Sequence, residues 1–298
     1  MKITISGASG LIGRRVLKTL AADGHTLQVL SRHAGTNMPG GVRVWPWDPV
    51  RGEPPTEALA DVDAIIHLAG EPVAQRWTPE VKQKIRESRV AGTANLVRAI
   101  AKLPQAPKTL VSASAMGYYG SRGDELLTES SAPGSDYLAE VCVAWEKAAQ
   151  EAEKLGIRVV RLRTGIVLDA RGGALAKMLP PFKMGVGGTI GSGRQWMSWI
   201  HAEDLAGIIR FALNQQVSGP INGVSPNPVT NADFTRALGG VLKRPAIVPV
   251  PALALKLAFG EMSEVLLASQ RVAPKVAEES GYRFQFTDVD AALADALK

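Results

Sequence analysis

The segment ITISGASGLIG, residues 3–13, decides the fold of this chain. Residues 3–6 are typical of a short buried strand, and the pattern that follows predicts a helix over residues 11–22. Between them stand Gly7, Gly10 and Gly13. Glycine lets the backbone turn tightly and approach a pyrophosphate, which the free N–H groups at a helix start can bind. A purely structural turn is the alternative, but a position between a strand and a helix favours dinucleotide binding.

The residues after the second predicted strand, 27–30, indicate which dinucleotide is bound. An acidic side chain at this place would bind the ribose 2′-hydroxyl of NAD. Here Ser31 and Arg32 follow instead. A guanidinium offers a planar fork of donors that suits a 2′-phosphate, and the serine hydroxyl can add to it. We therefore expect NADP(H) rather than NAD(H), with a solvated arginine in a turn as the alternative.

Short apolar strands alternate with helices through the first half of the chain. Further strands are expected at residues 42–44, 64–68, 109–112 and 157–162, with helices beginning at Thr78 and covering 137–155. Such alternation predicts an α/β fold with a doubly wound, Rossmann-type parallel sheet. We expect a nucleotide-binding domain over residues 1–165, its sheet completed by parts of 195–225. A smaller substrate-facing lobe follows over 166–298, with a helical module from about residue 245.

Composition limits the class of protein and its partners. The 298 residues are 46% hydrophobic and 21% charged with one cysteine, which predicts a globular, cytoplasmic protein without disulfides. No apolar run approaches the roughly 18 residues of a membrane span, so no membrane partner is expected. The net charge of +6 favours an anionic small molecule over nucleic acid, because the cations are dispersed and aromatic residues are 5%. The scattered histidines predict no metal site, and the oligomeric state stays open.

Several motifs together resemble the extended short-chain dehydrogenase/reductase superfamily. They are the glycine turn, residues 67–70, residues 92–96, Tyr118-Tyr119-Gly120 and residues 199–204. Within it the chain is most similar to the YfcH-like, sugar-nucleotide-epimerase-like subgroup. That similarity rests on Leu68 to Glu71, Arg76-Trp77, Ser88-Arg89, Trp145-Glu146, Arg163-Thr164-Gly165, residues 178–182 and 187–193, Pro249-Val250-Pro251 and Gly260-Glu261.

The resemblance implies a set of residues that contact NADP(H). Arg89 would reach the cofactor from the long helix, although with Lys82 and Arg86 it also forms a basic stripe, and such stripes are usually solvated. The residues implied are Gly7, Ser9, Gly10, Leu11, Ile12, Gly13, Ser31, Arg32, Leu68, Ala69, Gly70, Arg89, Arg163, Gly165 and Ile166.

The catalytic pattern of the superfamily is incomplete here. The resemblance implies a tyrosine that transfers a proton, with a lysine four residues later to lower its pKa from about 10. Tyr137 occupies the expected place, but Val141 stands where the lysine would be. Ser114 and Ser112 are the candidate serine partners, since Ala115 stands where that serine usually lies.

The loops of residues 171–199 predict a substrate site for an anionic, partly flat ligand such as a sugar nucleotide. Packing of Trp196 and Trp199 between the lobes is the alternative. Two functions remain: an NADP(H)-dependent oxidoreductase or epimerase acting on a carbonyl or sugar-nucleotide-like substrate, or a redox sensor that binds NADP(H) with little turnover. The candidate substrate residues are Trp77, Tyr118, Tyr119, Lys183, Arg194 and Trp199.

Overall fold

Seven parallel strands form the central sheet of the computed structural model, which describes residues 1–32, 38 and 41–298. Strand order reverses between β1 and β4, so the loops that leave these strands diverge and open a crevice at their carboxyl ends. In sheet order the strands are β11 (Gly219–Gly223), β7 (Arg158–Thr164), β5 (Thr109–Ala115), β4 (Ala64–His67), β1 (Lys2–Ser6), β2 (Thr26–Ser31) and β3 (Arg43–Pro46).

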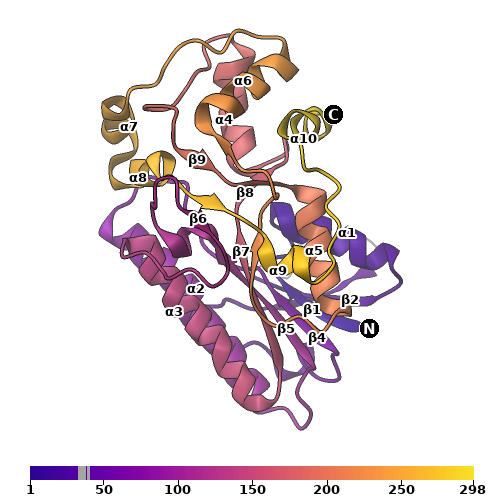
Figure 1. The fold of residues 1–298 in the computed structure, drawn as a ribbon. Helices are drawn as coiled ribbons and strands as arrows, with labels where there is room; N and C mark the ends of the chain where they lie inside the picture. Colours follow the sequence, from indigo (N-terminus) through magenta and orange to yellow (C-terminus); the bar gives the residue numbers. More distant parts are fainter. Residues whose placement is uncertain (33–37, 39–40) are drawn as a thin grey trace.

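Two layers of helices cover the sheet, one on each face (Figure 1). On one face α1 (Leu11–Ala22) packs beside α5 (Ala202–Asn214), and their apolar side chains share a core with β1 and β7. On the other face lie α2 (Pro79–Ile100) and α3 (Tyr137–Gln150). This is the expected doubly wound α/β architecture. Because α5 and β11 belong to it, the chain returns to the nucleotide-binding unit after residue 165.

A C-terminal lobe has its own apolar core, built around Trp199 and Phe234. Its central pieces are the strand pair β8 (Ile166–Leu168) and β10 (Trp199–His201), with helices α4 (Gly173–Lys183), α6 (Asn231–Leu242) and α10 (Val289–Ala296). The smaller elements of the chain are β6 (Leu126–Leu127), β9 (Trp196–Met197), β12 (Val229–Thr230), α7 (Ala252–Phe259), α8 (Ser263–Leu267), β13 (Arg271–Val272) and α9 (Lys275–Glu279). Of these, α9 packs against β11 and the core of the seven-stranded sheet.

Local sequence signals explain most element boundaries. The Thr78 hydroxyl accepts a hydrogen bond from the N–H of Val81, and Pro79 occupies the first position of α2. The helix expected over 137–155 instead ends at Gln150 and continues as a 3₁₀ turn, because Gly156 adopts φ +76°. The β8–β10 pair was not expected, since three-residue strands leave too little periodicity to detect.

The glycine turn is a close-packed junction of β1, α1 and β4. The Gly7 carbonyl accepts from the N–H of Gly10 at 3.0 Å, and Gly7 has φ +73°. A Cβ on Gly7 would lie 2.7 Å from the carbonyl carbon of Leu68, and one on Gly13 would lie 2.2 Å from the Gly7 oxygen. Both contacts are with backbone atoms, which cannot swing aside.

We expect Gly13→Ala to lower the free energy of unfolding by about 2–3 kcal/mol, because its methyl group overlaps the Gly7 carbonyl. Gly240→Ala is the matched control: it lies in α6, where an added methyl group would have no heavy atom within 4 Å, and alanine favours a helix by about 0.5–1 kcal/mol. Urea unfolding of both variants measures the difference. Equal stabilities would contradict the close packing.

His67 is a buried histidine that joins β4 to its neighbours. Its Nδ1 lies 2.6 Å from the Ser6 hydroxyl and its Nε2 lies 3.1 Å from the Thr93 hydroxyl. Burial lowers the pKa of His67 to about 4, so the ring is neutral at pH 7. His67 is therefore a neutral, hydrogen-bonded group in the interior of the sheet.

Acid should destabilise the protein through His67. Between pH 6.5 and 4 the unfolded chain binds a proton that the folded chain does not, so stability falls as pH falls through this window. The loss should reach about 2 kcal/mol at pH 5 relative to pH 7.5. Urea unfolding at the two pH values, compared between the protein and His67→Gln, measures it. The same pH dependence in the variant would assign the loss to other groups.

Candidate functional site

A cleft of about 510 Å³ opens at the carboxyl ends of β1, β2 and β4. It lies where the strand order reverses, which is the usual ligand position in such sheets. Eight of the predicted cofactor residues line it: Gly7, Ser9, Gly10, Ser31, Arg32, Leu68, Ala69 and Gly70. Other lining residues are Leu30, Trp47, Asp48, Pro49, Val50, Glu71, Pro72, Lys84, Glu87 and Ser88.

One end of the cleft is the start of α1. Gly10 is the N-cap of this helix, and it has neither a capping side chain nor an acidic residue in the first turn. The helix therefore points unneutralised N–H groups and a positive dipole end toward the cleft. Since side chains at Gly7 and Gly13 would fill the turn, these residues fit a bound pyrophosphate.

Arg32 also lines the cleft, and its exposed side chain lies just beyond β2, the strand that pairs with β1. One of the carboxylates in the lining, Asp48, is engaged by Arg51 at 3.3 Å and by the N–H of Val50. The segment from Trp47 to Val50 was missed by the sequence analysis. The position of this segment depends on the pairing of β3 with β2, and no local sequence motif predicts that pairing.

Arg89 lies behind the wall of the cleft rather than on a solvated face of α2. Its guanidinium donates to the carbonyl oxygens of Glu71 at 2.9 Å and Ile85 at 3.1 Å, and it lies 5.1 Å from the centre of the Trp145 ring. It also packs against Gly70, which lines the cleft. Burial lowers its pKa. Arg89 thus holds the loop that follows β4 in place.

Arg163 requires a correction, because the structure places it in a buried ion pair and not on the cleft. Its Nε and Nη2 donate to the two carboxylate oxygens of Glu146 at 2.7 and 2.9 Å. Its Nη1 donates to the Tyr119 hydroxyl and to the Glu129 carbonyl. With 3% of the side chain exposed, four of its five N–H groups donate to partners inside the protein.

Five other predicted cofactor residues also lie off the cleft lining. The Leu11 side chain packs near Gly172 and Gly173 at the start of α4. Gly165 is pressed against the Ser198 carbonyl, where an added Cβ would be 2.6 Å away. The remaining three are Ile12, packed against the apolar core, Gly13, buried in the turn, and Ile166, paired with Trp199 in the β8–β10 sheet.

The three candidate catalytic hydroxyls all have protein partners. Tyr137 donates to the carbonyl of Lys82, and burial raises the pKa of Tyr137 although Arg89 opposes the shift. Ser114 donates to Glu146 at 2.7 Å. Ser112 is buried, and its hydroxyl lies 3.4 Å from the Ala113 carbonyl. No lysine stands four residues after Tyr137 in α3, and Val141 is buried in the core. The protonated phenol is the stable form of Tyr137 here.

The predicted substrate residues separate into interior and surface groups. Trp199 is fully buried in the C-terminal lobe, which corrects its predicted role and agrees with the packing alternative. Tyr119 is also fully buried; it donates to Asn222, and burial raises its pKa to about 12. Tyr118 lies under the Arg163 guanidinium at 3.5 Å. Lys183 and Arg194 are exposed on the lobe, away from the cleft lining.

Trp77 and Tyr137 are brought together near the junction of the two units. Their rings meet edge to face with centroids 5.3 Å apart, and the Lys82 ammonium lies 4.4 Å from the Tyr137 ring centre. The same ammonium pairs with Glu261 at 2.6 Å. Side chains from α2 and the C-terminal lobe therefore meet beside the candidate tyrosine.

Two more cations tie the loop of residues 71–78 to the C-terminal lobe. Lys177 of α4 donates to the Ala74 carbonyl at 2.6 Å. The Arg76 guanidinium donates to the Leu257 and Ala258 carbonyls at the end of α7, at 3.4 and 3.5 Å. Since these acceptors are uncharged, both cations keep a net positive charge that an anionic substrate can meet.

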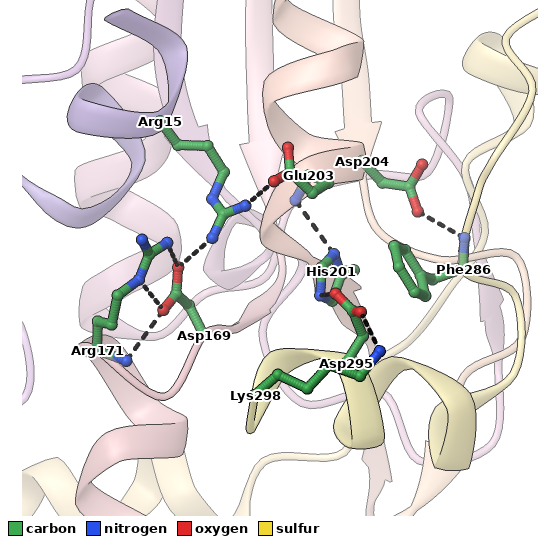
Figure 2. Close-up of polar contacts among 9 residues, drawn as sticks. All are labelled: Arg15, Asp169, Arg171, His201, Glu203, Asp204, Phe286, Asp295 and Lys298. Atoms are coloured by element: carbon green, nitrogen blue, oxygen red, sulfur yellow. Dashed lines mark hydrogen bonds and ion pairs between the residues drawn. The ribbon is translucent and has the colours of Figure 1, made fainter. Parts of the chain in front are cut away.

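A polar network links α1 to the C-terminal lobe (Figure 2). Arg15 bonds to Asp169 and Glu203, and Arg171 donates to the same Asp169 carboxylate. Burial works against the charge of Asp169, but the hydrogen bonds from Arg171 and Arg15 hold its pKa below its ordinary value. His201 accepts from the N–H of Glu203 as the N-cap of α5 and lies 3.5 Å from Asp295. This network joins α1, α5 and α10 structurally.

Asp204 is equally structural, since it accepts from the N–H groups of Gln285 and Phe286. In the described residues no group of histidine, cysteine or carboxylate side chains is arranged to hold a metal ion. Over those same residues, no helix combines the length and apolar character needed to cross a membrane. Cys142 is buried, and burial raises the pKa of its thiol to about 12.

Comparison with known proteins gives two family matches. Residues 3–224 match the NAD dependent epimerase/dehydratase family, and residues 250–296 match a domain of unknown function, DUF1731. The second match covers α7 to α10, the part that the sequence analysis set apart as a helical module.

Similar proteins cover the whole chain. The epimerase family protein YfhF of Bacillus subtilis is 40% identical over 299 residues, covering 100% of this chain and 98% of the relative. The chloroplastic SDR39U1 homolog of Arabidopsis thaliana is 42% identical and covers 98% of this chain and 86% of the relative. The crystal structure of human epimerase family protein SDR39U1 with NADPH matches with a TM-score of 0.88 at 34% identity, covering 99% of both chains. This chain therefore belongs to the NAD dependent epimerase/dehydratase family.

Proposed function

We propose that this protein binds NADP(H) in the cleft and acts as an oxidoreductase or epimerase on a carbonyl or sugar-nucleotide-like substrate. The observation that carries the proposal is that the glycine turn and Arg32, which follow the adjacent strands β1 and β2, line the same cavity. The turn suits the pyrophosphate and the guanidinium suits a 2′-phosphate. The human relative crystallised with NADPH supports this choice of coenzyme.

A bound nicotinamide coenzyme would supply or accept a hydride. The chain's own residues bind and orient the two partners. Backbone groups of Gly7, Gly10 and Ala69 would hold the coenzyme, while Arg76 and Lys177 would attract a negatively charged substrate toward Tyr137. Tyr137, which keeps its proton at neutral pH, would donate a hydrogen bond to the substrate oxygen after leaving the Lys82 carbonyl.

A redox sensor with little turnover is the second candidate. The hydroxyl of Tyr137 donates a hydrogen bond to a backbone carbonyl. The Ser114 hydroxyl donates to the Glu146 carboxylate, which also pairs with Arg163. A site of this kind holds a coenzyme without an available proton donor. The cations on the substrate side favour the enzyme, because a sensor needs no second anionic ligand.

Arg32→Glu should weaken NADPH binding at least tenfold, about 1.4 kcal/mol, because it replaces attraction for the 2′-phosphate by repulsion. NADH binding should change less, since NADH lacks that phosphate. Calorimetric titration with both coenzymes measures the effect. Arg283→Glu makes the same charge change at an exposed residue outside the cleft and should leave both affinities unchanged. Unaltered NADPH affinity in Arg32→Glu would remove Arg32 from the site.

Tyr137→Phe separates the two functions. Stopped-flow oxidation of bound NADPH is followed against a panel of carbonyl compounds and sugar nucleotides. If the protein is an enzyme, the variant should lose about 100-fold or more in turnover while binding NADPH as before, since proton transfer contributes about that much. Full activity in the variant would place the proton donor elsewhere. Tight NADPH binding with no turnover by the unaltered protein would favour the sensor.

A further inference from the structure

The C-terminal lobe carries the most exposed large apolar side chains in the described part of the chain. Ile247 is 81% exposed, Met184 and Leu257 are each 71% exposed, and Leu253 is 68% exposed. Val186 and Phe259 belong to the same set. We call these six residues the apical apolar face. Globular proteins rarely leave such a concentration uncovered unless the surface contacts something.

Two of the segments that carry this face run side by side. Val248 N–H donates to the Gly187 carbonyl and Val250 N–H donates to the Thr189 carbonyl, at 3.1 and 2.8 Å. These bonds bring the chain after α4 next to the chain before α7. Figure 1 shows α7 and the segment leading to it at the outer edge of the lobe, away from the seven-stranded sheet. The apical apolar face thus lies at the periphery of the lobe.

Four cations accompany the apolar side chains: Lys183, Lys243, Arg244 and Lys256. All four are exposed, and none forms an ion pair with another described residue. Of the two carboxylates in the neighbouring chain, Glu261 is already paired with Lys82, and Glu264 lies beyond it on α8. The apical apolar face therefore combines exposed apolar side chains with four cations that form no ion pair with another described residue.

The combination of exposed apolar side chains and cations favours some binding partners of this face over others. A second copy of the chain would bring the same four cations opposite these four, and like charges repel at close range. A lipid surface with anionic headgroups attracts the cations and accepts protruding apolar side chains without preformed pockets. α7 suits that surface, because Lys256 is the one charged residue among its eight.

We propose that the apical apolar face docks on the anionic surface of a lipid membrane, with Leu253, Leu257 and Ile247 entering the interface. The expectation of no membrane partner rested on the lack of a spanning segment, and a peripheral contact needs none. Glu261 and the α7 end are joined to Lys82 and Arg76, so docking would place the substrate side of the proposed site near the membrane.

Flotation of the full chain with vesicles tests the proposal. Vesicles of phosphatidylcholine with about one third phosphatidylglycerol should bind the protein at least tenfold better than phosphatidylcholine alone, and added salt should weaken the binding. Leu257→Asp should lower the partition coefficient more than tenfold. Lys243→Glu with Arg244→Glu should do the same.

Matched controls separate docking from misfolding. Leu155→Asp introduces a charge at an exposed leucine outside the face, and Lys18→Glu with Lys108→Glu reverses two exposed cations elsewhere. Both should bind vesicles like the unaltered protein. NADPH affinity should be unchanged in every variant, so failure of docking and failure of the proposed function are distinguishable.

Three outcomes would overturn the proposal. The first is no vesicle binding by the unaltered protein, as expected if the partner is a soluble acidic protein. The second is an equal loss of binding in the control variants. The third is a dimer, seen by analytical ultracentrifugation, that Leu257→Asp dissociates while vesicle binding stays unaffected; this would assign the face to a second copy.

Discussion

The contact on which the structure depends is the meeting of Gly13 with the carbonyl of Gly7. With no side chain at either residue, the first turn of α1 rests directly on the end of β1, and the backbone after β4 closes to Gly7. Any larger residue would separate these three elements, since the opposing atoms are backbone. The close packing of Gly13 on Gly7 also leaves the α1 N–H groups facing an open cleft. Stability and ligand binding therefore both depend on the absence of side chains at these two residues.

A second constraint holds the opposite side of the sheet. The carboxylate of Glu146 on α3 receives both Arg163 on β7 and Ser114 on β5. Removing one member of a buried pair costs about 3–5 kcal/mol, because the remaining charge loses its partner in a medium that solvates it poorly. This ion pair therefore commits Ser114 and Arg163 to the interior. Ser114, one of the candidate catalytic hydroxyls, thus serves as a hydrogen-bonding support of this ion pair.

The sequence predicted what depends on local chemistry. The glycine turn, the cap at Thr78, the strand–helix alternation and the place of Ser31 and Arg32 follow from short-range rules, whereas Ser9 and residues 68–70 were implied by the family resemblance. Trp199, Tyr119 and Arg163 could not be placed this way, because a motif gives a residue's position on a strand but not which side chains meet it across the sheet. Trp47 reaches the cleft only through the pairing of β3 with β2, which no local pattern records.

The loop of residues 71–78 connects the coenzyme cleft with the C-terminal lobe. Glu71 and Pro72 line the cleft, while Ala74 and Arg76 contact the C-terminal lobe, so one short segment forms both a coenzyme wall and a contact with the lobe. Arg89 fixes the first part of this loop through the Glu71 carbonyl. The second part is held by one hydrogen bond from α4 and two longer ones to α7, each worth only about 1 kcal/mol. One short loop therefore joins the coenzyme cleft to the lobe, because α2 holds its first part through Arg89 and Ser88 while α4 and α7 hold its second part.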